Sequence, residues 1–118
     1  MNDKVDIGLN GTGREDLQRV TDTGWFADDQ DAGRFCVAYA IRAGVQAGET
    51  AGTRTTWASG NFDPAGEIRQ LVQVFYPDCD TPVRLIEHLA HEGLRLVRSR
   101  IEAGVDGPEE LLGAGMPK

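Results

Sequence analysis

The sequence has little of several features that mark particular classes of protein. It contains two cysteines, Cys36 and Cys79, which is too few for the disulfide framework of a small secreted fold, and it favours a reducing compartment. Its longest apolar run, residues 35–41, is far shorter than the ~20 residues that a membrane helix needs. The first residues lack the apolar stretch of a secretory signal. We therefore expect a cytoplasmic protein with no membrane partner.

Lysine is also scarce, and the charge is acidic. The only lysines are Lys4 and Lys118, against ten arginines, and the formal net charge is −7. Residues 1–50 carry a net charge of −4, residues 51–100 are neutral, and residues 101–118 carry −3. Such a field does not draw the whole molecule to a phosphate backbone. Binding to nucleic acid would therefore need a local basic patch, and only the second half of the chain offers one.

What is present indicates one ordered, mainly helical domain. The chain has 118 residues, 40% of them hydrophobic and 26% charged, as in ordinary globular domains. Alternating apolar residues predict a strand over 5–9, and β-branched and aromatic residues predict a second over 54–57. Helical spacing predicts four helices, over 13–22, 31–42, 64–76 and 82–103. We expect a compact domain over 1–103 and a flexible tail over 104–118, where Gly and Pro are frequent.

Local sequence signals fix the expected helix starts. Thr12 and Glu15 have the spacing of a capping box, in which each side chain satisfies a free backbone N–H of the first turn. Asp31 is a favourable N-cap for the second helix. Thr81 followed by Pro82 predicts the start of the last and longest helix, because proline is well tolerated at the first helical position.

Apolar stripes on these helices predict the core. In the third helix, Ile68, Leu71, Val72 and Phe75 lie at i, i+3, i+4 and i+7, which places them on one face. The segment 35–41 is apolar on every side and is expected to be covered all round. The predicted core is Leu17, Val20, Phe35, Val37, Ile41, Ile68, Leu71, Phe75, Ile86, Leu89 and Val97.

The two halves of the chain follow a similar order. Residues 4–45 and 54–101 each run from strand to helix, then to an aromatic pair with an acidic loop, and then to a helix. The aromatic pairs are Trp25-Phe26 and Phe75-Tyr76. Identity between the halves is low, so an internal duplication and an unrepeated four-helix domain both remain open.

The strand KVDIGLN and the helices REDLQRVTDTG and DAGRFCVAYAIRAG resemble the ribbon-helix-helix family of DNA-binding proteins. The resemblance covers about residues 4–45 and implies a two-stranded ribbon that enters the major groove, with one strand from each subunit of a homodimer. If the halves are duplicated, residues 54–57 supply the second strand within one chain. The polar face of the first strand departs from the family, because Asp6 has the wrong sign for DNA and Gly8 has no side chain to contact a base.

Candidate nucleic-acid contacts are few. Arginine can bind phosphate through two parallel hydrogen bonds. The main candidates for contact with nucleic acid are therefore arginines of the second half of the chain, together with two polar residues of the first strand. These six candidates are Arg54, Arg84, Arg95, Arg98, Lys4 and Asn10. Alternatively, the arginines of the last helix pair with its own glutamates, Glu87, Glu92 and Glu102.

No pattern in the sequence indicates catalysis or a cofactor. The glycine-rich turn 8–13 matches no nucleotide-binding motif, and no nucleophile–base arrangement is visible. His88 and His91 lie one turn apart and could share a metal, but zinc needs three or four ligands and no other ligand has supporting spacing. Glu87/His91 and His88/Glu92 are i, i+4 pairs, which more simply predict a solvated, ion-paired face of the last helix. We therefore expect a protein without enzymatic activity, with a metal-dependent activity around these histidines as the remote alternative.

Two functions remain open at this stage. One is a DNA-binding regulator of transcription of the ribbon-helix-helix type. The other is an acidic protein-interaction subunit that docks on a larger partner and does not contact DNA. A homodimer is predicted, because a short ribbon is marginal alone and the apolar segment 35–41 needs cover. The duplicated alternative predicts a monomer that pairs its own two strands.

Overall fold

The computed structural model of the protein describes residues 3–52 and 54–112. The helices and strands of this part of the chain are β1 (Asp6–Leu9), α1 (Gly11–Thr21), α2 (Asp29–Arg42), β2 (Arg54–Ala58), α3 (Ser59–Phe62), α4 (Glu67–Phe75), α5 (Pro82–Glu102) and α6 (Pro108–Leu112). The predicted mainly helical fold with a two-stranded ribbon is confirmed. The predicted number of four helices is too low, since α3 and α6 are single turns, too short to produce a periodic pattern in the sequence.

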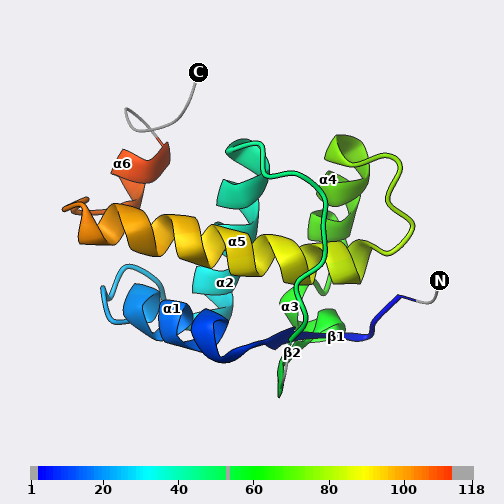
Figure 1. The fold of residues 1–118 in the computed structure, drawn as a ribbon, viewed down its shortest axis with the longest axis horizontal. Coiled ribbons are helices and arrows are strands. Elements are labelled where there is room, and N and C mark those ends of the chain that lie inside the picture. Colours follow the sequence, from blue (N-terminus) through cyan, green and yellow to red (C-terminus); the bar gives the residue numbers. More distant parts are fainter. Residues whose placement is uncertain (1–2, 53, 113–118) are drawn as a thin grey trace.

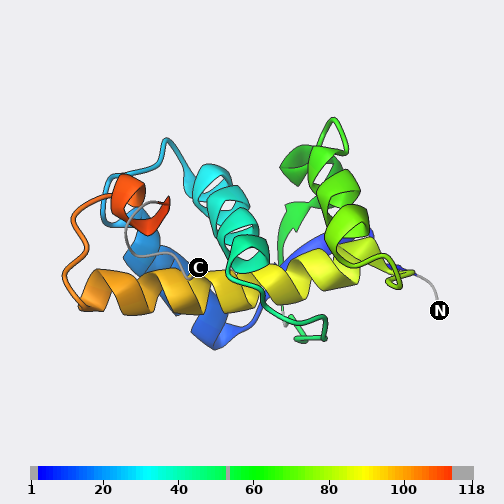
Figure 2. The same ribbon diagram turned by 90° about the horizontal axis from the view of Figure 1, so that it is seen from above.

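The long helix α5 is the axis of the fold. It begins at Pro82, as the Thr81-Pro82 signal predicts, and its buried face includes Leu89, Leu94 and Val97. In Figure 1, α1 and the ribbon lie along one side of α5, while α4 and α6 lie on the other. Figure 2 shows that α2 and α4 cross α5 at separate points along its length. This leaves α4 at one end of the molecule, near the start of α5.

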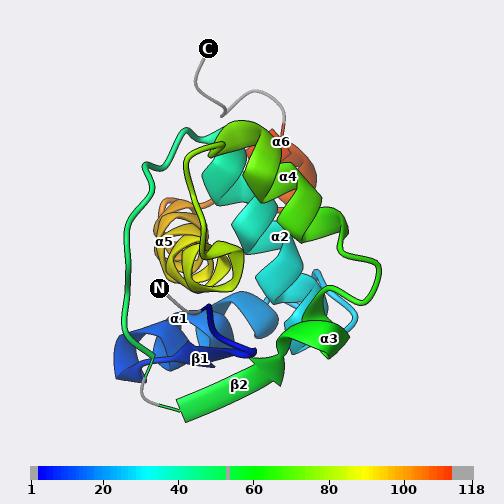
Figure 3. The same ribbon diagram turned by 90° about the vertical axis from the view of Figure 1, so that its right-hand side faces the viewer.

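The ribbon is formed within one chain. Strand β1 pairs antiparallel with β2, and the partners include Ile7 with Trp57 and Leu9 with Arg54. The register shifts between Ile7 and Gly8, as in a β-bulge. Figure 3 shows the connector from the end of α2 running down one side of the molecule to reach β2. The two strands therefore meet without a second subunit.

Two glycines let α2 pack closely on its neighbours. A Cβ at Gly93 of α5 would lie 1.9 Å from the carbonyl oxygen of Cys36 in α2, so the two helix backbones touch there. A Cβ at Gly33 of α2 would lie 2.7 Å from the ring of Trp57 in β2, which stacks on Phe62 with ring centroids 4.9 Å apart. Helix α2 therefore packs against α5 on one side and against the ribbon on another, so the apolar segment 35–41 finds cover within the same chain.

Most of the predicted core is buried. The buried members are Leu17, Val20, Val37, Ile41, Ile86, Leu89 and Val97. Phe35 and Ile68 are only partly buried against this core. The prediction is wrong for Leu71 and Phe75, whose side chains are exposed. The reason is that only one edge of the apolar stripe of α4 packs on the rest of the protein. Val72, on that edge, is fully buried.

Two helix caps lie two and three residues before the positions that the sequence predicts. The side chain of Asn10 accepts a hydrogen bond of 2.8 Å from the Gly13 N–H, so α1 begins at Gly11 and the Thr12–Glu15 capping box is wrong. Asp28, rather than Asp31, caps α2 by accepting from the Asp31 N–H at 2.8 Å. Several residues in each segment have capping side chains, and tertiary packing selects among them.

The C-terminal segment contains a helix as far as the structure describes it. In α6, Leu111 is completely buried, and the Leu112 carbonyl accepts a hydrogen bond of 3.0 Å from the Arg42 side chain. Residues 113–118 of the predicted tail lie outside the described residues. None of the helices in the described ranges is long and apolar enough to cross a membrane.

Candidate functional site

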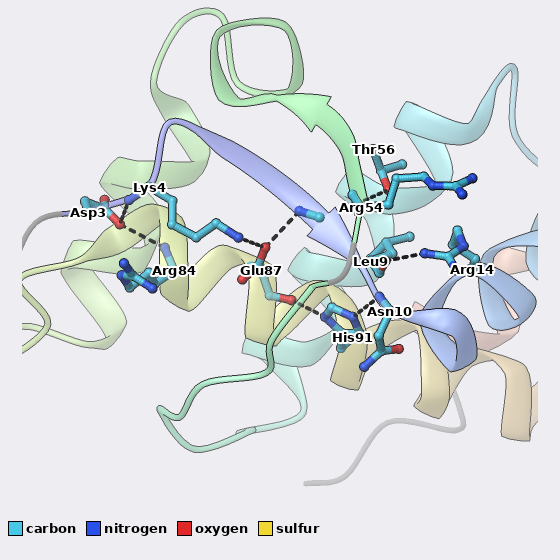
Figure 4. A network of polar contacts seen from close by, with 11 residues as sticks. Asp3, Lys4, Leu9, Asn10, Arg14, Arg54, Thr56, Arg84, Glu87 and His91 are labelled. Atoms are coloured by element: carbon cyan, nitrogen blue, oxygen red, sulfur yellow. Dashed lines mark hydrogen bonds and ion pairs between the residues drawn. The ribbon is translucent and has the colours of Figure 1, made fainter.

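A buried polar cluster joins β1 to α5. The Glu87 carboxylate is buried, accepts a hydrogen bond of 2.8 Å from the Gly8 N–H, and forms an ion pair with the Lys4 ammonium group. One turn further along α5, Nε2 of His91 accepts a hydrogen bond of 3.1 Å from the Asn10 N–H. Figure 4 shows Lys4 reaching Glu87 and the His91 ring beside Asn10.

This cluster gives β1 a second hydrogen-bonded edge. Residues four apart on a helix advance by about 6 Å, and residues two apart on a strand advance by about 6.6–6.8 Å. The side chains of Glu87 and His91 on α5 are therefore spaced like the N–H groups of Gly8 in β1 and of Asn10, which directly follows β1. The other edge of β1 pairs with β2, so helix side chains stand where a third strand would lie.

The cluster uses both ring nitrogens of His91. Its Nδ1 donates a hydrogen bond of 2.8 Å to the Glu87 carbonyl, because a carbonyl only accepts, which leaves Nε2 as the acceptor for Asn10. His88 points elsewhere, with Nδ1 hydrogen-bonded to the Thr50 hydroxyl at 2.8 Å. In the described part of the chain, no three His, Cys, Asp or Glu side chains gather as metal ligands. The structure therefore does not bring the two histidines together as a metal site.

The two first-strand candidates for DNA contact, Lys4 and Asn10, make internal contacts. The Lys4 side chain pairs with Glu87, and the Asn10 side chain caps α1. The N–H groups at the start of α5 are occupied as well. The Asp3 carboxylate accepts from the Val83 N–H at 2.8 Å and from the Arg84 N–H at 3.0 Å. An aspartate of this chain thus takes the place that a phosphate would need.

The four candidate arginines are spread over the molecule. Arg84 and Arg98 lie roughly 21 Å apart along α5 at 1.5 Å per residue. Arg95 pairs with Glu92 at 2.9 Å, as the ion-pairing alternative predicts, and Arg98 pairs with Asp16 of α1 at 2.9 Å and with Glu102 at 3.7 Å. Arg54 is exposed on β2. The hydrogen bond that Arg98 donates to the Asp16 carboxylate raises the pKa of Arg98 above its ordinary value, so this guanidinium stays charged.

The least covered apolar surface lies on α4. The exposed fractions of Leu71, Val74 and Phe75 are 39%, 72% and 58%. Because residues three and four apart share a face of a helix, these side chains form one surface, which we call the α4 face. Sequence reasoning placed Leu71 and Phe75 in the core and did not single out Val74.

A groove adjoins the α4 face. Two hollows, of about 540 and 330 Å³, share Ala47, Phe75 and Tyr76 as lining residues. The Tyr76 hydroxyl donates a hydrogen bond to the Val45 carbonyl and so ties the end of α4 to the connector after α2. Burial raises the pKa of Tyr76, which keeps this donor protonated. This hydrogen bond therefore holds the two segments that line the groove, the end of α4 and the connector after α2, against each other.

One side of this groove is acidic. Glu49, Asp78 and Asp80 line the larger hollow, and we call these three residues the acidic rim. Neither hollow has an arginine or lysine among its lining residues. Cys79, which is partly buried, also lines the larger hollow. Glu49 also lines a neighbouring hollow together with Arg84. The arrangement offers apolar contact beside the negative charge of Asp78 and Asp80.

No known relative explains this arrangement. The chain matches no protein-family model, no curated protein and no solved structure. We therefore infer the function from the chain's own geometry.

Proposed function

We propose that this chain is a protein-interaction subunit that binds a larger partner through the α4 face. The observation that supports the proposal is the exposure of Leu71, Val74 and Phe75 on a single helix. Isolated exposed apolar residues are ordinary, whereas contiguous ones beside a groove are typical of interaction sites. An aromatic residue at the edge of such a groove is the usual anchor of an interface.

The α4 face supplies part of the free energy of binding, and contacts in the adjoining groove must supply the rest. Complete burial of one Val, Leu or Phe side chain gains about 1.5–3 kcal/mol. Three such side chains, partly exposed in the free protein, supply several kcal/mol before the costs of association. A helix laid into an apolar groove is a common way to use such a surface.

DNA binding receives less support. The proposed contacts Lys4, Arg95 and Arg98 are already paired with carboxylates, which would have to be displaced by phosphate. The resemblance to ribbon-helix-helix proteins stays a prediction. The duplication of the two halves stays a prediction.

Selection of peptides tests the proposal without a known partner. A random library of displayed peptides is enriched on the immobilised protein, and each enriched peptide is titrated against a Val74→Ser/Phe75→Ser variant. We expect affinity to fall by about ten-fold or more, because truncated anchors dominate such interfaces. The matched control is Val5→Ser, which removes an equally apolar side chain with 79% exposure on another part of the surface.

Two outcomes of this experiment would contradict the proposal. If no peptide is enriched, or if enriched peptides bind the double variant as tightly as the wild type, the α4 face is not the docking site. Circular dichroism of each variant confirms that its helices are intact.

A further inference from the structure

The α4 face and the acidic rim lie on one continuous surface. Phe75 connects the two, since it is exposed on α4 and lines the larger hollow together with the acidic rim. Along the chain, Phe75 is followed by Tyr76 and then by Pro77, Asp78, Cys79 and Asp80. A segment that buries the α4 face and continues into the larger hollow therefore meets the acidic rim next.

The charge of this surface selects its occupant. Glu49, Asp78 and Asp80 are exposed and line the larger hollow, which has no arginine or lysine in its lining. Glu49 also shares a neighbouring hollow with Arg84, so Asp78 and Asp80 carry the charge argument. Burying apolar groups beside these carboxylates is favourable only if the partner supplies positive charge. An acidic partner segment would add repulsion instead.

The same charges disfavour a second copy of this chain as the occupant. A symmetric dimer places the same patch of each subunit against its counterpart. Both acidic rims would then lie at one interface, between molecules that each carry a net charge of −7. Like charges in contact across an interface are costly.

We propose that the groove beside α4 binds a short basic, apolar segment of another protein, whose apolar anchors cover Leu71, Val74 and Phe75 while an adjacent arginine or lysine meets the acidic rim. This inference rests on the proposed function and adds the chemistry of the partner. It assigns separate roles to the two parts of the surface: the apolar face supplies affinity, and the rim supplies selection by charge.

The peptides enriched on the wild-type protein test this chemistry directly. We expect them to combine two or more apolar residues with at least one neighbouring Arg or Lys. Their affinity should fall by about 3- to 10-fold for an Asp78→Asn/Asp80→Asn variant, since exposed ion pairs contribute modestly. That difference should shrink as salt is raised, because exposed charges are screened.

A matched variant separates local charge from net charge. Glu15→Gln/Glu109→Gln also removes two exposed carboxylates but leaves the groove unchanged. We expect this control to bind the peptides within about two-fold of the wild type, because distant surface charges are screened. An equal loss in both variants would show that only the overall charge matters and would overturn the role of the rim.

Alkylation of Cys79 reports whether the peptide enters the groove. Cys79 lines the larger hollow, whereas Cys36 is completely buried and stays silent in the folded protein. A bound peptide should slow the reaction of Cys79 with iodoacetamide, measured by mass spectrometry. An unchanged rate with saturating peptide would mean that the hollow is empty and would overturn this inference.

The outcomes distinguish the two proposals. Peptides that need Val74 and Phe75 but are neutral or acidic would overturn the basic-segment inference and leave the α4 face as a docking site. Peptides that do not need the α4 face would overturn both. A dimer that dissociates on the Val74→Ser/Phe75→Ser change would identify a second copy as the occupant and overturn the basic partner.

Discussion

At the scale of single residues, Glu87 makes the most consequential polar contacts. Its buried carboxylate satisfies the Gly8 N–H and neutralises Lys4, so both β1 and the N-terminal segment depend on it. No buried side-chain nitrogen or oxygen is left without a partner in the described part of the chain. Removal of the Glu87 carboxylate would therefore leave the buried Gly8 N–H without an acceptor, and the desolvation of that group would no longer be offset.

We expect Glu87→Ala to lower the free energy of unfolding by about 2–4 kcal/mol, because a buried N–H loses its acceptor and an ammonium group loses its counter-ion. Glu87→Gln should cost less, since its amide oxygen still accepts from Gly8. Urea denaturation of both variants measures the difference. Equal losses for the two variants would show that charge alone, rather than the hydrogen bond to β1, is what matters.

The two cysteines should differ sharply in reactivity. Cys36 is completely buried, and burial, with a smaller effect of Asp16, raises the pKa of its thiol well above the ordinary value. Since the thiolate is the reactive form, Cys36 should stay unmodified at mildly alkaline pH until the protein unfolds. A thiol assay should titrate one cysteine in the native protein and two in urea. Native Cys79→Ser should titrate none, and a reactive thiol in that variant would contradict the packing of α2 on α5.

At the scale of elements, the sequence predicted those helices and strands whose signals are local. The Thr81-Pro82 start of α5 and the alternation of β1 are short-range patterns, and both elements appear where expected. The apolar stripe of α4 was recognised, but its burial was not predictable. A stripe shows which face of a helix is apolar, and only the tertiary structure shows whether this chain or another molecule covers it.

The polar contacts were less predictable than the elements. Glu87 and His91 were expected to form a solvated, ion-paired face of the last helix, yet both are buried against β1. Their i, i+4 spacing suits either arrangement. What decides between them is the position of β1, whose Gly8 N–H lies 2.8 Å from the Glu87 carboxylate. Such a match across 79 residues has no signature in local sequence.

The crossing of α2 over α5 should tolerate no side chain at Gly93. A Cβ would lie 1.9 Å from the Cys36 carbonyl oxygen, which is backbone and unable to move aside alone. We expect Gly93→Ala to destabilise the protein by roughly 3 kcal/mol, at the upper end of overpacking effects. Thermal unfolding by circular dichroism measures it.

The matched control for that change is Gly11→Ala, at the first position of α1. Nothing lies within 4 Å of a Cβ there. We expect stabilisation of up to about 1 kcal/mol, because alanine restricts the unfolded chain and favours the helix. If Gly93→Ala proved as harmless as this control, the close approach of the two helices would be wrong.

At the scale of the whole molecule, the fold removes the reasons that favoured a homodimer. The ribbon pairs within the chain, and α2 finds most of its cover on α5 and Trp57. We therefore expect a monomer, as the hypothesis of an internal duplication predicts. Light scattering at micromolar concentration should give a mass near 12.8 kDa. A mass of twice that value would show that a second copy covers an exposed surface, and the α4 face would be the first candidate.

The charge of the whole molecule governs the last prediction, which concerns DNA. The net charge is −7, and Arg95 and Arg98 already pair with carboxylates. The N–H groups of Gly8 in β1 and of Asn10, just after β1, donate to side chains of α5. We expect no binding to duplex DNA in gel shifts at about 50 mM salt, a condition that favours electrostatic attraction. Binding there would contradict this expectation. The ribbon-helix-helix hypothesis would then predict that Arg95→Ala/Arg98→Ala flattens the salt dependence by roughly two units of slope, one for each lost phosphate contact.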